Sequence, residues 1–186
     1  MNYAWAAQVH FGYREEDPIL TEFYNGIFSD EVTDESDVGD RAGKPVNVRG
    51  TSLLLKDYVS LKFYLTVDDS IDASSLTARF SCGVKTKSAS LQKNGSFYTV
   101  SFPLSAKELR TLTSVWITDP SGAVVSNRYT DSVSSYCAYC LNVKNVQGSE
   151  RDAVEKLMAY ADAAKAYLDE KYPYVLDEDN LTPVFH

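Results

Sequence analysis

A period of two in the hydrophobic residues is the feature that most constrains how this chain can fold. Between residues 59 and 67, apolar side chains occupy every second position: Val59, Leu61, Phe63, Leu65 and Val67. Side chains of a β-strand point alternately to opposite faces, so this stretch predicts a strand with one buried face. Similar stretches lie at about 46–56, 76–82, 86–92, 96–103, 113–118 and 123–129. We therefore expect about seven short strands.

Turn-forming residues separate the predicted strands. Asn94-Gly95 is the clearest signal, because both residues tolerate positive φ and the pair favours a type I′ hairpin. Pro120-Ser121-Gly122 interrupts the apolar pattern between the last two stretches. Several short strands at this spacing are typical of an antiparallel β-sandwich or a curled sheet. We therefore predict a β-sandwich over residues 46–130.

A period of three to four residues, typical of helices, replaces the strand period at both ends of the chain. A helix is predicted over 132–143, and another begins at Ser149, where Ser149 and Asp152 form a capping pair. The predicted segments are a helix at 1–13, an acidic linker at 14–45 in which 18–28 favours a short helix, the β-sandwich at 46–130, a helical pair at 131–172 and a tail at 173–186. The predicted fold class is α+β, with an N-terminal helix and two C-terminal helices packed on the sandwich.

One string of residues occurs twice. Met1–Ala7 and Met158–Ala164 both read Met-x-Tyr-Ala-x-Ala-Ala, and the two copies are offset by 157 positions. This offset is too long for a solenoid repeat and matches the length of a whole domain. We expect residues 1–13 to be the end of one module, followed by a second module that closes with its own copy. The small residues of the string let a neighbouring backbone approach closely, which favours a packing role.

Charge and hydropathy exclude two classes of partner. The net charge is −8, and residues 1–40 contain ten acidic residues against one basic residue, Arg14. Such a region repels phosphates, and no basic stripe with interleaved aromatics offsets it, so we expect no nucleic-acid binding. No run of 18 apolar residues occurs, so we expect no membrane insertion.

The residues that most often carry catalysis are scarce. Histidine occurs only as His10 and His186, which makes a catalytic triad or a histidine-rich metal site implausible. The glycines are dispersed and form no phosphate-binding motif. We therefore expect a non-enzymatic protein with no catalytic residue, no cofactor and no metal.

The three cysteines form no disulfide framework, because their number is odd. Cys137 and Cys140 form a C-x-x-C whose helical spacing places them on one apolar face with Val133, Tyr136, Leu141 and Val143. A second C-x-x-C or a nearby histidine would be needed to complete four metal ligands. Core packing is therefore favoured over a redox or metal pair.

Three aromatic residues fall on outward positions of the predicted strands. The alternation places Tyr64, Phe97 and Trp116 on the side opposite to the core residues of their strands. Such aromatics can form a patch for a sugar ring or a protein partner. The alternative is a second core layer beneath the C-terminal helices, because large aromatic side chains are usually mostly buried.

Several of these motifs together resemble a family of tandem modules in large surface proteins of gut clostridia. Tyr3–Tyr13 resembles the string Tyr-Gly-Ala-Ala-Ala-Gln-x-Tyr-Phe-Gly-Tyr that ends such modules. Further similar stretches are Ser52–Asp57 with Leu61–Tyr64, Tyr98–Phe102 with Ala106–Leu109, and Asp131–Tyr136. Departures from the family include Ala4 and Ala161 in place of glycine, Lys165 in place of glutamine and Leu168 in place of phenylalanine.

The resemblance implies an extracellular or cell-surface module of a commensal bacterium. Some family members resemble B-cell superantigens, which bind immunoglobulin variable domains outside the antigen site. The expected function is therefore binding of a host protein by a monomeric module, with antibody variable domains first among the partners. The alternatives are a carbohydrate-binding module of a secreted glycan-degrading protein, using Trp116, Tyr64 and Phe97 on a polysaccharide, or a structural spacer.

Overall fold

The structure is a computed structural model that describes residues 34–55 and 58–171, with side chains as far as Lys165. The predicted helix at 1–13, most of the acidic linker and the tail at 173–186 lie outside the described residues. The first copy of the repeated string lies outside them as well.

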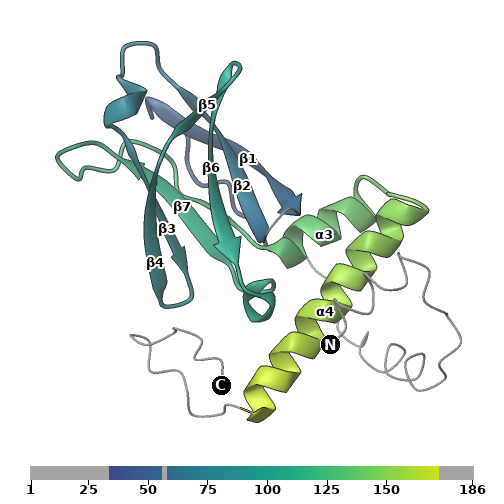
Figure 1. The fold of residues 1–186 in the computed structure, drawn as a ribbon. Coiled ribbons are helices and arrows are strands. Elements are labelled where there is room, and N and C mark those ends of the chain that lie inside the picture. The colour runs from purple at the N-terminus through teal and green to yellow at the C-terminus, as the bar shows by residue number, and fades with distance from the viewer. Residues whose placement is uncertain (1–33, 56–57, 172–186) are drawn as a thin grey trace, which may run out of the picture.

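The strands form two antiparallel sheets of four strands each (Figure 1). The first sheet has the order β1 (Val46–Leu55), β2 (Val59–Val67), β6 (Phe97–Leu104), β5 (Gln92–Asn94). The second has the order β4 (Lys85–Ser90), β3 (Thr77–Cys82), β7 (Thr113–Thr118), β8 (Tyr129–Asp131). The described part of the chain thus contains eight strands, where the sequence predicts about seven.

Helical segments complete an α+β fold in which strands predominate. Two short 3-10 turns, η1 (Ala73–Ser75) and η2 (Ala106–Glu108), lie between strands. Two α-helices, α3 (Val133–Asn142) and α4 (Ser149–Lys171), follow the last strand. Figure 1 shows both helices beside one end of the sheets, where α3 contacts β1 and α4 packs against α3 and η2.

Two predicted strands differ from the observed ones. The stretch 86–92 is divided at Leu91 between β4 and β5, which belong to different sheets. The stretch 123–129 is not a strand until Tyr129, and before that it makes only isolated bridges. The reason is that this segment crosses between the sheets: Val125 donates its N–H to Ile117 of β7 at 2.9 Å and accepts from Val46 of β1 at 3.3 Å.

The predicted hairpin exists, but its turn lies one residue further along the chain. Asn94 pairs with Phe97, so the two loop residues are Gly95 and Ser96. Gly95 has a φ of +61°, whereas Asn94 and Ser96 do not have positive φ. Positive φ at the first loop residue alone is typical of a type II′ turn, not of the type I′ turn predicted from Asn94-Gly95.

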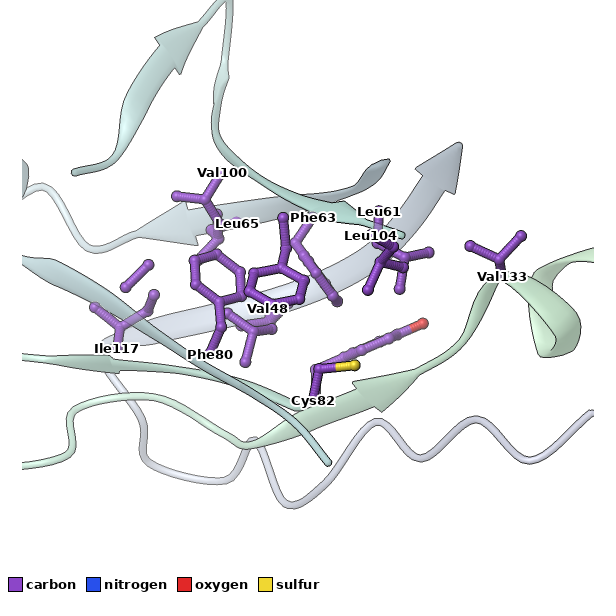
Figure 2. Packing of buried hydrophobic residues seen from close by; sticks show 14 of the residues in the cluster. Val48, Leu61, Phe63, Leu65, Phe80, Cys82, Val100, Leu104, Ile117 and Val133 are labelled. Carbon is purple, nitrogen blue, oxygen red and sulfur yellow. The ribbon is translucent and has the colours of Figure 1, made fainter. Parts of the chain in front are cut away.

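The inward side chains of both sheets share one hydrophobic core (Figure 2). The alternation predicted for β2 is confirmed, because Leu61, Phe63 and Leu65 are all 0% exposed. Across the sheets, the ring of Phe80 lies 6.0 Å from that of Phe63 and stacks at 5.1 Å on that of Phe102. This contact between the sheets fixes which side chains point outward.

Both predicted C-terminal helices form, but α4 begins at Ser149 itself, and the Asp152 N–H donates to the Gly148 carbonyl at 3.0 Å, not to the predicted Ser149 cap. Ser132 caps α3 and accepts a hydrogen bond from the Ser135 N–H at 2.9 Å. Cys137 and Cys140 are buried and form no disulfide, which confirms the core-packing interpretation of the C-x-x-C. In the second copy of the repeated string, Met158 and Ala161 are buried in the core, in agreement with a packing role. Val143, which the spacing placed on the apolar face of α3, is instead 67% exposed because it follows the last helical residue.

Candidate binding surfaces

Two of the three predicted aromatics lie together on the outer face of the first sheet. The rings of Tyr64 and Phe97 are 6.5 Å apart in an edge-to-face arrangement. The Tyr64 hydroxyl lies 3.2 Å from Ser52 Oγ, and the Lys62 ammonium lies 5.5 Å from the Tyr64 ring centroid. Phe97 is 41% exposed, so this pair is a small surface feature and not a second core layer.

Trp116 lies on the other sheet. Val115 and Ile117 are fully buried in the core between the sheets, so Trp116 points away from that core. Tyr64 points away from the same core on the opposite side, because Phe63 and Leu65 are buried. The three aromatics therefore do not form one platform: the structure brings Tyr64 and Phe97 together and separates Trp116 from them.

Two arginines accompany Trp116. The guanidinium carbon of Arg128 lies 4.0 Å from the centroid of the Trp116 ring. Arg79 is the residue opposite Trp116 in the register of β3 and β7. Trp116 is thus half-buried, with the Arg128 guanidinium over its ring and Arg79 beside it in the strand register. Neither arginine was predicted from the sequence as part of a site. Arg128 lies in the irregular segment before β8, so no strand alternation places it beside Trp116.

A third surface lies at the end of the sheets beside α3. It contains exposed apolar side chains from the end of β1, from the residue before β2, and from α3 and its C-cap; α3 contacts β1. We call it the α3-end surface, and its residues are Leu55, Tyr58, Tyr139 and Val143, with exposed fractions of 61%, 72%, 41% and 67%. The run Leu53-Leu54-Leu55 was the available signal, because three consecutive apolar residues in a strand cannot all face the core.

A buried polar network connects β1 to the start of α3. The Thr51 hydroxyl donates to Asp131 Oδ2, and the Ser132 N–H donates to Asp131 Oδ1 at 2.8 Å. Asp131 is only 3% exposed, and this burial raises the pKa of its carboxyl above the usual value. Because the network is buried, we assign it a structural role: it links β1, β8 and the start of α3.

The described residues contain no cluster of three or more histidine, cysteine, aspartate or glutamate side chains able to hold a metal ion. Among the same residues, none of the helices combines the length and the apolar character needed to span a membrane. No protein-family model, curated protein or solved structure matches this chain. The function is therefore argued from the surfaces themselves.

Proposed function

We propose that this protein is a non-enzymatic recognition module that binds a protein partner through the α3-end surface. The observation that carries the proposal is the exposure of Tyr58, just before β2, and of Val143, at the C-terminal end of α3, at 72% and 67%. Helix α3 contacts β1, the strand paired with β2. Single exposed apolar residues are common, but a group of them at one place is typical of a protein interaction site.

The composition of the α3-end surface fits a protein interface. Tyr139 lies with its ring 6.4 Å from that of Tyr136, so tyrosine contributes two neighbouring rings beside the exposed Val143. Tyrosine is enriched in interfaces because it buries a large area while keeping a hydroxyl for hydrogen bonding. A few such residues usually provide most of the binding free energy.

The partner class comes from the family that the sequence resembles. Antibody variable domains are the host proteins to test first, and the protein acts as an extracellular or cell-surface monomer. Repeated modules of this kind gain avidity on a multivalent target. For the scaffold we propose a β-sandwich, which is supported by the core shared between Phe63 and Phe102 of one sheet and Phe80 of the other.

Binding to a panel of Fab fragments, measured by biolayer interferometry, tests this function. We expect at least one heavy-chain family to bind, and the substitutions Tyr58→Ser and Val143→Ser to weaken that binding about tenfold each. Val84→Ser is the matched control, since Val84 is 66% exposed at the β3–β4 turn. No binding to any Fab at about 50 μM would refute the partner class.

Phe97→Ser separates the α3-end surface from the Tyr64–Phe97 pair. If Phe97→Ser abolishes Fab binding and Val143→Ser leaves it unchanged, the Tyr64–Phe97 pair is the interface and the surface proposed here is wrong. A structural spacer, the alternative that requires no ligand, predicts that no Fab binds and that no variant changes anything.

A further inference from the structure

The outer face of the second sheet has an ordered composition. Its strand register places outward side chains in three rows across β4, β3 and β7, because Ala78, Phe80 and Cys82 point inward. The middle row is Ser88, Arg79 and Trp116. The flanking rows carry only hydroxyl side chains: Ser90, Thr77 and Thr118 on one side, and Thr86, Ser81, Ser114 and Thr130 on the other.

Arg128 extends the middle row beyond Trp116. Its guanidinium lies over the indole ring, with the guanidinium carbon 4.0 Å from the ring centroid. Stacking of this kind holds the guanidinium plane, and it leaves the N–H donors at the edge of the group available for a ligand. We call Arg79, Trp116 and Arg128 the Arg–Trp strip.

Among the described residues, the arginines of the strip form no ion pair, and none of the outward positions in the three rows is acidic. Asp37 lies at the margin, bridged to Thr130; its Oδ1 accepts the Gly39 N–H at 2.9 Å, and its carboxylate forms no ion pair with Arg128. In a protein with a net charge of −8, two such arginines on one face indicate an anionic ligand.

We propose that the Arg–Trp strip binds an acidic glycan. A carboxylate or sulfate group of the sugar lies between Arg79 and Arg128, where planar guanidinium groups offer paired donors to its oxygens. The sugar ring contacts the edge of Trp116, and the exposed hydroxyls of the flanking rows exchange hydrogen bonds with sugar hydroxyls. Thr118 is not among them, because it is 5% exposed and its hydroxyl donates to the Thr77 carbonyl. This site lies on the opposite sheet from the Tyr64–Phe97 pair and shares no residue with the α3-end surface.

The composition of the face favours a glycan over an acidic peptide. Trp116 is the only large apolar side chain among the outward residues of the three rows. A protein interface usually needs several apolar anchors surrounded by a polar rim. Serine and threonine side chains can both donate and accept hydrogen bonds, which suits a ligand covered with hydroxyl groups.

Calorimetric titration of the full chain with defined glycans tests the proposal. The probes are an oligogalacturonate, its fully methyl-esterified form, which keeps the skeleton and removes the charge, and a chondroitin sulfate oligosaccharide. The variants are Arg79→Gln and Arg128→Gln, with Arg49→Gln as the control, because Arg49 is exposed on β1 of the other sheet. Thermal unfolding of each variant verifies that it folds.

We expect one or both acidic probes to bind and the methyl ester to bind at least tenfold more weakly. Each strip variant should weaken binding of the acidic probe about ten- to hundredfold, in line with loss of a charged hydrogen bond. Arg49→Gln should leave it unchanged, and added salt should weaken it. Whether the carboxylate or the sulfate probe binds more tightly identifies the acidic group.

Three results would overturn the proposal. The first is no binding of either acidic probe, and the second is equal affinity of the folded wild-type protein and both strip variants. The third is binding of a poly-glutamate peptide as tightly as the glycans and with the same dependence on Arg79 and Arg128, which would assign the strip to an acidic peptide. Fab binding through the α3-end surface does not depend on any of these results.

Discussion

Arg110 and Asp162 form a bidentate ion pair, although they are 52 positions apart in the chain. Arg110 Nε lies 2.5 Å from Asp162 Oδ1, and Nη2 lies 2.8 Å from Oδ2. Both side chains are largely shielded, with exposed fractions of 25% and 20%. Arg110 follows η2, whereas Asp162 belongs to the second copy of the repeated string in α4. The pair therefore stabilises the packing of α4 against the connection between β6 and β7, which contains η2.

Replacing Asp162 should loosen α4. We expect Asp162→Ala to lower the free energy of unfolding by about 1–3 kcal/mol, because a partly buried guanidinium loses a charged, paired acceptor. Urea denaturation followed by circular dichroism measures this change. Glu155→Ala is the matched control: it removes the exposed Arg151–Glu155 pair of the same helix, worth about 0.5 kcal/mol or less. Equal effects of the two substitutions would show that the Arg110–Asp162 pair does not stabilise the packing of α4.

The Cys137 thiol should be inert in the folded protein. Burial raises its pKa to about 12, and the neighbouring Cys140 adds to the shift. Since the thiolate is the reactive form, Ellman's reagent at pH 8 should not modify Cys137 until the protein unfolds. The comparison of native and urea-unfolded protein, with the labelled peptide identified by mass spectrometry, measures this protection. Rapid labelling of native Cys137 would show that the helix α3 opens readily.

Asp131 should make stability depend on pH in the opposite sense to an ordinary salt-bridged aspartate. Burial raises the pKa of its carboxyl in the folded state above the usual 3.8, so the folded protein binds the proton more tightly than the unfolded chain. Its contribution to stability is greatest below pH 3.8 and is lost as the pH rises through the folded-state pKa.

The substitution Asp131→Asn removes this titration while keeping the side-chain shape. Asparagine Oδ1 can still accept the Ser132 N–H, and its amide can donate to the Thr51 hydroxyl. We expect the variant to gain stability relative to the wild type as the pH rises from 4 to 7, measured as a difference in Tm at each pH. A difference that is constant over this range would show that Asp131 does not titrate as described.

The strands could be predicted where one face of the chain is buried and could not be predicted elsewhere. Val59–Val67 alternates because only one side of β2 contacts the core, and its inward residues were identified correctly. The stretch 123–129 was predicted as a strand from its apolar pattern, but only Tyr129 belongs to one, because Val125 hydrogen-bonds to both sheets. The sequence pattern of that segment therefore did not reveal its path.

The same limit applies to the candidate surfaces. Outward positions such as Tyr64 and Trp116 follow from the alternation within their strands, but the sheet to which each strand belongs is decided by pairing between distant segments. The stacking of Arg128 on Trp116 depends on the irregular segment before β8. Local periodicity therefore predicted that the three aromatics face outward, but it could not show that they are on two different faces.

Gly39 is not a member of the Arg–Trp strip, but its replacement should disturb the strip through the backbone of Arg128. Its φ is +61°, and a β-carbon there would lie 2.2 Å from the backbone oxygen of Arg128. Since backbone cannot move aside as a flexible side chain can, Gly39→Ala must displace one of the two segments. The Asn127 side chain, which donates to the Val38 carbonyl at 2.6 Å, ties these same segments together.

We expect Gly39→Ala to lower the free energy of unfolding by about 2–4 kcal/mol, through backbone strain and the clash together. Gly43→Ala is the matched control, since Gly43 has a φ of +65° but open space around its β-carbon position. It should cost only about 1–2 kcal/mol, the strain of positive φ alone. Urea unfolding of both variants measures the difference, and equal losses would show that the contact between Gly39 and Arg128 is not a close one.

If the Arg–Trp strip binds an acidic glycan, Gly39→Ala should also weaken that binding at temperatures where the variant remains folded, whereas Gly43→Ala should not.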